Sequence, residues 1–161
     1  MKKTLSILTL AIAVTSGVVH AHGGMKPEPA AAAVKEQKPW GIAGEAAAVT
    51  RTVTLSMTDA MRFTPDSIQV KRGETVRFVL RNDGRMLHEM VIGTRAALDG
   101  HAELMKKFPD MEHDEPYMAH VAPGRQGEIV WRFNRAGEFD FACLIPGHYQ
   151  AGMKGRIVVQ P

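Results

Sequence analysis

Residues 143–153, Cys143-Leu-Ile-Pro-Gly-His148-Tyr-Gln-Ala-Gly-Met153, place a thiol, an imidazole and a thioether on one short segment. The segment lies between two stretches of strand-like alternation, so we expect it to form a loop at the end of a sheet. Two His and one Cys in a trigonal plane, with a weak axial Met, are typical of a type 1 copper site. A site of this kind needs one further His.

The best candidate for the second imidazole is His88. It lies in a predicted strand over residues 86–92, where alternation places it on the same face as Met86, Met90 and Ile92. Taken alone, a Cys or a Met in such a pattern is usually packing in a core. The joint arrangement instead predicts one bound copper ion with four ligands. The predicted ligands are His88, Cys143, His148 and Met153.

Period-two alternation recurs along the rest of the chain and predicts further short strands. These segments are centred on residues 53–57, 68–70, 76–80, 129–133, 139–143 and 155–159. Short strands separated by regular turns favour an all-β, Greek-key β-sandwich. Residues 95–108 break the period and contain helix formers, which predicts a short helix followed by a polar loop to about Gly124.

The first 21 residues have the pattern of a secretory signal peptide. Lys2 and Lys3 precede an apolar run over residues 5–14, and the small residues before position 22 suit cleavage after Ala21. The run is too short to cross a bilayer, since a spanning helix needs about 20 apolar residues. We therefore expect the mature chain in the periplasm, without membrane insertion.

The mature chain is expected to contain a leader and one domain. Residues 22–49 are rich in Gly, Ala, Pro, Glu and Lys and have no sustained apolar period, which predicts a flexible leader. Residues 50–161 contain the alternating segments and are long enough for a single domain with its own core.

The balance of charged residues limits the kinds of partner that this chain is expected to bind. Two of the 20 Lys and Arg lie in the signal peptide, which leaves 18 basic against 17 acidic residues. This near balance gives no reason to expect nucleic acid or an anionic membrane as a partner.

A single cysteine cannot form an intramolecular disulfide, so Cys143 is a buried bystander, an intermolecular partner, a nucleophile or a metal ligand.

The block over residues 141–158 resembles the ligand loop of the cupredoxins, the blue-copper proteins, with a ligand spacing similar to that of rusticyanin. The resemblance covers about residues 50–161. Residues 111–118, Met-Glu-His-Asp-Glu-Pro-Tyr-Met, are similar to the CopI-like group of small periplasmic cupredoxins associated with bacterial copper tolerance. One departure is Glu89, because many cupredoxins follow the first His ligand with an Asn that helps to fix the Cys loop.

Other His and Met side chains that could bind copper lie in two places. One is the N-terminus expected after cleavage, and the other is the predicted helix and loop from residue 95 to about Gly124, here called the excursion. These candidate accessory ligands are His22, Met25, His101, Met105, Met111, His113, Met118 and His120. One interpretation is a second copper site for loading or buffering. The alternative is a solvated helix and loop with ordinary Met packing. The family resemblance slightly favours the first interpretation.

Three functions fit these features. The first is copper tolerance, with copper ions and a periplasmic redox or copper-transport protein as partners. The second is soluble electron transfer between respiratory partners through the edge of His148, beside Pro146, Ala151 and Met86. The third, a cuprous oxidase with substrate copper on the excursion, would be enzymatic. No other enzyme is indicated, since no nucleophile and base are paired by motif.

Overall fold

The computed structural model describes residues 35–109 and 114–161. The predicted signal peptide and four candidate accessory ligands lie outside the described residues. These ligands are His22, Met25, Met111 and His113. In the part of the chain that is described, no helix is long and apolar enough to cross a membrane.

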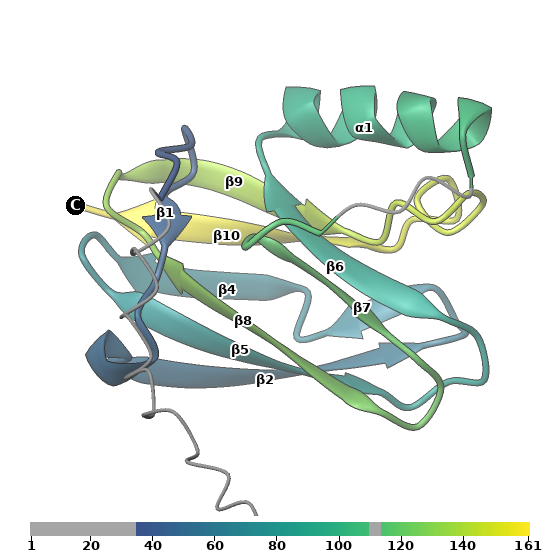
Figure 1. The fold of residues 1–161 in the computed structure, drawn as a ribbon, viewed down its shortest axis with the longest axis horizontal. Coiled ribbons are helices and arrows are strands. Elements are labelled where there is room, and N and C mark those ends of the chain that lie inside the picture. The colour runs from purple at the N-terminus through teal and green to yellow at the C-terminus, as the bar shows by residue number, and fades with distance from the viewer. Residues whose placement is uncertain (1–34, 110–113) are drawn as a thin grey trace, which may run out of the picture. The chain divides into compact units, whose positions relative to one another are not determined.

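The described residues form two five-stranded sheets with one α-helix, as Figure 1 shows. The strand orders are β1-β8-β5-β2-β3 and β4-β10-β9-β6-β7. The strands are β1 (Ile42–Ala43), β2 (Arg51–Thr58), β3 (Arg62–Thr64), β4 (Ser67–Lys71), β5 (Thr75–Asn82), β6 (His88–Gly93), β7 (Met118–Val121), β8 (Gln126–Arg132), β9 (Gly137–Ala142) and β10 (Lys154–Gln160). The prediction of an all-β sandwich with one short helix is confirmed.

Alternating side chains from both sheets meet in one apolar core. Leu55 and Phe78 come from the first sheet, and Ile92, Phe141 and Ile157 come from the second. All five are fully buried. Burying a side chain of this size stabilises the folded state by about 1.5–3 kcal/mol, so the core holds the two sheets at a fixed separation.

The helix α1 (Arg95–Lys107) covers the outer side of the second sheet, where Figure 1 shows it running above β6 and β9. It begins after Thr94, whose hydroxyl accepts a hydrogen bond from the backbone N–H of Ala97 at 3.2 Å. Leu98, Ala102 and Met105 form its buried stripe at helical spacing. They pack with residues of β6 and β9 in a second apolar cluster. The predicted helix at residues 95–108 is therefore confirmed to within one residue.

The predicted polar loop before Gly124 is only partly a loop. It contains β7, a four-residue edge strand that pairs with β6 and places Val121 opposite His88. A strand this short, directly after polar residues, gives too little alternation to be recognised from sequence. Met86 also differs from the prediction. It lies before β6 and is 40% exposed, so it does not share the buried face of His88.

Residues 35–49, part of the predicted leader, are packed against the sheets. Trp40 is buried, and its carbonyl oxygen accepts a hydrogen bond from Trp131 Nε1 at 2.9 Å. β1 then pairs with β8, and a 3-10 helix (Ala46–Ala48) leads into β2. The packed part of the chain therefore begins before residue 50. The buried Trp40 and the β1–β8 pairing together hold this Ala-rich segment in place.

Candidate metal centre

His88, Cys143 and His148 meet at one end of the second sheet. Their ligand atoms all lie within 4.8 Å of one another, and this is the one group of three or more His, Cys, Asp and Glu with such spacing among the residues described. Cys143 Sγ and His148 Nδ1 are 3.3 Å apart, and the two imidazole centroids are 5.0 Å apart. Three residues predicted as copper ligands are thus brought together.

The loop after β9 folds back so that its two ends meet. Cys143 N donates to Met153 O at 3.0 Å, and Met153 N donates to His148 O at 3.1 Å. Gly147 and Gly152 both have a φ of 92°, which suits glycine and allows the two tight turns. Met153, the fourth predicted ligand, is fully buried beside the other loop residues. Backbone hydrogen bonds therefore hold Cys143, His148 and Met153 close together without a bound metal.

His88 begins β6 and is fully buried. Its Nε2 lies 3.0 Å from Asp59 Oδ1, whereas its buried Nδ1 has no hydrogen-bond partner among the described residues. The pKa of Asp59 is lowered, chiefly by a backbone hydrogen bond from Arg85, so the carboxylate is ionised at neutral pH. An ionised carboxylate can only accept, so Nε2 carries the proton. A buried nitrogen without a partner, beside a thiol and a second imidazole, is the donor arrangement that a metal ion would satisfy.

Cys143 is fully buried, and burial raises the pKa of its thiol to about 12. Backbone hydrogen bonds from Glu89 and Ile145 oppose this by favouring the thiolate. The pKa of His148 is lowered by burial and by the nearby His88, so its imidazole is neutral at pH 7 and keeps a lone pair. A metal ion that binds this group must therefore displace the Cys143 proton, while the His148 imidazole is already in a ligating form.

Glu89 occupies the position at which many cupredoxins carry Asn. Its side chain is 1% exposed, and Oε1 accepts a hydrogen bond from the backbone N–H of Leu144 at 2.7 Å. Its Oε2 lies 2.7 Å from His120 Nε2, on the neighbouring strand β7. The β6–β9 register, in which Val91 lies opposite Ala142, brings Glu89 level with Leu144 when it is extended by two residues. A carboxylate thus holds the residue after Cys143, and it takes its own partner from the edge strand.

The pKa of His120 is raised, first by its hydrogen bond to Glu89. The sequence does not indicate that His120 contacts Glu89, because β7 is too short to show the alternation of a strand. Asp59 is equally remote in sequence from the histidine that it contacts. Neither residue stands in a recognisable motif.

The described accessory candidates do not gather into a second group of this kind. Met105 and Met118 lie together in the apolar cluster beneath α1, where both are buried. His101 is half-buried on α1, and His120 lies against Glu89. For the two methionines, the packing interpretation accounts for the observed positions.

The ligand loop is also joined to the helix. Tyr149 OH donates to Asp99 Oδ1 at 2.5 Å, and burial raises the pKa of this tyrosine to about 12. Asp99 belongs to α1, and the Tyr149 ring packs against the apolar cluster beneath that helix. The residue next to His148 is therefore anchored to the excursion.

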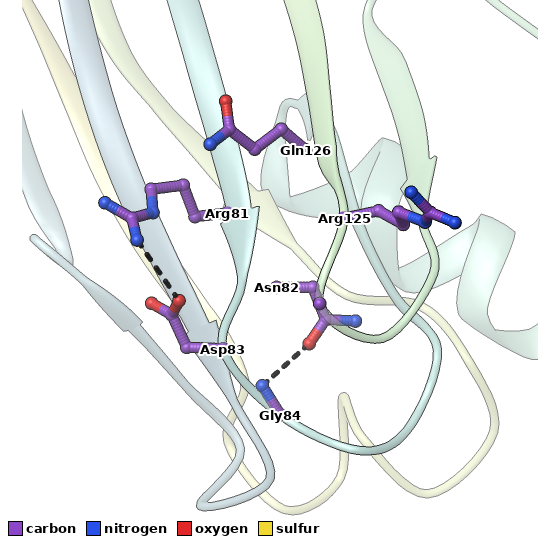
Figure 2. A pocket seen from close by; sticks show the side chains of 7 residues that line it. Arg81, Asn82, Asp83, Gly84, Arg125 and Gln126 are labelled. Atoms are coloured by element: carbon purple, nitrogen blue, oxygen red, sulfur yellow. Dashed lines mark hydrogen bonds and ion pairs between the residues drawn. The ribbon is translucent and has the colours of Figure 1, made fainter.

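A surface hollow lies between the β5–β6 and β7–β8 turns, and Figure 2 shows it from close by. It is lined by Arg81, Asn82, Asp83, Gly84, Gly124, Arg125 and Gln126. Asn82 Oδ1 accepts from Gly84 N at 2.9 Å, and the side chains of Arg81 and Asp83 face each other. The guanidinium groups of Arg81 and Arg125 point away from each other in Figure 2, so they do not converge on a ligand. The hollow contains none of the candidate copper ligands.

Comparison with known proteins agrees with the donor set. The chain is 56% identical over 122 residues to the copper-resistant cuproprotein CopI of Rubrivivax gelatinosus, covering 76% of this chain and 74% of that protein. It is 37% identical to the protein of the same name from Pseudomonas aeruginosa, with 76% and 83% covered. Reduced auracyanin from Roseiflexus castenholzii has a similar fold, with a TM-score of 0.60 at 19% identity, over 70% of this chain and 99% of that one.

The sequence pattern of one family matches most of the chain. This family is described as copper binding proteins of the plastocyanin/azurin family, and the match covers residues 49–160. The match includes His88, Cys143, His148 and Met153. The chain therefore belongs to the copper-binding plastocyanin/azurin family, the cupredoxins.

Proposed function

We propose that the chain binds one copper ion at the cluster of His88, Cys143 and His148, with Met153 as a weak fourth ligand, and serves copper tolerance in the periplasm. The observation that carries this proposal is the cluster itself, whose ligand atoms lie within 4.8 Å of one another. Two imidazoles and one thiolate with a distant thioether are the donors of type 1 copper. The relatives named as copper-resistant cuproproteins support the tolerance role.

When bound, copper supplies one-electron exchange between Cu(I) and Cu(II). The chain holds the ligands still during that exchange. Glu89 ties the β9 end to β6 through Leu144 N, and the Cys143 and Met153 backbones bond to each other. Ligands that need not move between the two oxidation states allow fast exchange, and a buried site keeps the ion away from other reactions.

The first test is a visible spectrum of the copper-loaded protein beside a Cys143→Ser variant. We expect an intense sulfur-to-copper charge-transfer band in the wild type and its loss in the variant. Met153→Leu should keep the band but shift the reduction potential, because the axial ligand tunes that potential. Met118→Leu, which replaces a buried Met in the cluster beneath α1, is the matched control. A wild type without the band would overturn the proposal.

A second candidate function, soluble electron transfer, is favoured by exposed apolar side chains near the cluster. Met86 and Leu87 are 40% and 46% exposed and directly precede His88. Pro146 and Ala151 are also exposed, on either side of the half-buried His148. Such a surface suits brief contact with a redox partner through the His148 edge.

Growth of a deletion strain separates the two functions. Copper tolerance predicts that the strain grows poorly at raised copper and normally under ordinary respiration. Complementation with the Cys143→Ser gene should fail to restore growth at raised copper, whereas the Met118→Leu gene should restore it. Loss of respiration without copper sensitivity would favour the electron carrier.

A further inference from the structure

Asp59 directly follows β2 and lies 29 residues before His88 in the chain. Its carboxylate accepts three contacts from one short stretch. Oδ2 accepts from Arg85 N at 2.8 Å, and Oδ1 lies 3.3 Å from Met86 N and 3.0 Å from His88 Nε2. One side chain from the first sheet therefore holds both the approach to β6 and the first imidazole of the cluster.

The contact with Asp59 determines which of the two His88 ring nitrogens is available to bind a metal. Nε2 is engaged by a carboxylate, and Nδ1 is buried without a hydrogen-bond partner among the described residues. A histidine with its proton on Nε2 presents the Nδ1 lone pair to a metal. A carboxylate behind a ligating imidazole fixes the orientation of the ring and raises the basicity of the nitrogen that faces the metal.

The geometry leaves Asp59 little freedom to turn away. A Cβ added at Gly84 would collide with Asp59 Oδ1 and lie 2.9 Å from its Cγ. The turn that carries Gly84 is held by Asn82, whose Nδ2 donates to Met86 O at 2.7 Å and to Val121 O at 2.8 Å. The absence of a side chain at Gly84 is therefore what admits the carboxylate between the turn and His88.

We propose that Asp59 is a positioning residue of the copper site, which holds His88 with Nδ1 toward the metal and, through its negative charge, favours Cu(II) over Cu(I). This inference rests on the proposed copper function. A negative charge one imidazole away from the ion interacts more strongly with the doubly charged state than with the singly charged state. Asp59 would thus bias the site toward retaining oxidised copper.

The test replaces Asp59 by Asn in the full chain, with Asp83→Asn as the matched control. Asp83 lies near the same turn and carries the same charge, but it contacts Ser56 Oγ at 2.6 Å and Arg81 at 3.8 Å, and neither is a candidate ligand. The first readout is the ¹⁵N chemical shifts of the His88 ring in the copper-free protein. We expect a single tautomer in the wild type and in Asp83→Asn, and a mixture of both tautomers in Asp59→Asn.

The second readout is the affinity for Cu(II) and for Cu(I). Loss of a carboxylate behind a ligating His typically lowers metal affinity by about 10- to 100-fold. We expect Asp59→Asn to lose Cu(II) affinity in this range and to lose less Cu(I) affinity. The reduction potential should then rise by about 59 mV for each tenfold difference between the two losses. Gly84→Ala, which displaces the carboxylate without removing it, should change the potential in the same direction.

Equal losses for Cu(I) and Cu(II), with His88 still in one tautomer, would mean that Asp59 only supports the turn, and would overturn the inference. A potential shift no larger than that of Asp83→Asn would also overturn it. The tautomer measurement needs no copper. If the wild type proved to lack the charge-transfer band, the proposed function would fail while the role of Asp59 in holding His88 would still be tested.

Discussion

Glu89 makes a buried contact with Leu144 N and a partly exposed contact with His120, and replacing Glu89 by Gln or by Ala separates the two. Glu89→Gln keeps a side-chain oxygen that can accept from Leu144 N but removes the negative charge beside His120. Glu89→Ala removes both contacts. Because the Leu144 residue is buried, no water can replace the lost acceptor without a rearrangement of the loop.

The expected losses of unfolding free energy follow from these contacts. A charge-assisted hydrogen bond contributes about 1 kcal/mol more than a neutral one, which is the expected loss for Glu89→Gln. In Glu89→Ala a buried N–H is left without an acceptor, at a cost of about 1–3 kcal/mol. One buried methylene group is also lost, at about 0.8 kcal/mol. We therefore expect a loss of about 2–4 kcal/mol for the Ala variant.

Urea unfolding of the copper-free protein, analysed by linear extrapolation, measures both values. Copper-free protein is used so that altered metal affinity does not enter the result. Glu138→Gln is a suitable control, because Glu138 lies on β9 but is exposed. Equal losses for the Gln and Ala variants would refute the assignment of the Leu144 hydrogen bond as the larger contribution. A loss below about 1 kcal/mol for Ala would refute the burial argument altogether.

Three further outcomes follow from the structure. Glu89 raises the pKa of His120. The stability that this pair contributes is therefore fully present below the ordinary histidine pKa of 6.5 and is lost as pH rises through the higher pKa of the folded state. The free energy of unfolding, measured against pH, should show this decline in the wild type but not in His120→Ala. A bulky charge from Ala151→Glu should slow electron exchange with a physiological redox partner in stopped-flow measurements, since Ala151 is exposed near His148; unchanged rates would exclude that face as the route. Met105→Leu should cost less than about 1.5 kcal/mol and leave the copper stoichiometry in a titration unchanged, because this side chain packs beneath α1; a fall in stoichiometry would make it a ligand.

The grouping of the candidate ligands on the loop after β9 was predictable because these residues are close in sequence. Cys143, His148 and Met153 are separated by a few residues, and the alternation on both sides placed them between strands. His88 was predictable for a different reason, since its position in a strand put it with the apolar face. Its burial agrees with that argument.

The supporting residues were not predictable in the same way. Asp59 reaches His88 only because β2 and β5 pair in parallel, which brings the end of β2 beside the turn that follows β5. His120 reaches Glu89 only through β7, which is too short to produce a clear alternation. Trp40 lies in a segment whose composition is typical of a leader, but its buried indole and the β1–β8 pairing hold that segment against the sheet. The positions of Asp59, His120 and Trp40 therefore depend on contacts between segments that are far apart in the sequence.

The cluster joins β6 to a loop that begins 55 residues later, as the Glu89–Leu144 hydrogen bond also does. An ion bound there would act as a removable cross-link between distant segments of the chain. Unfolding would have to release that ion, so at a free concentration 100 times the dissociation constant the folded state would gain about 2.7 kcal/mol. Through this linkage, metal supply would set the fraction of unfolded chains open to proteolysis. The amount of protein in the cell would then rise with the metal that it holds, without any change in synthesis.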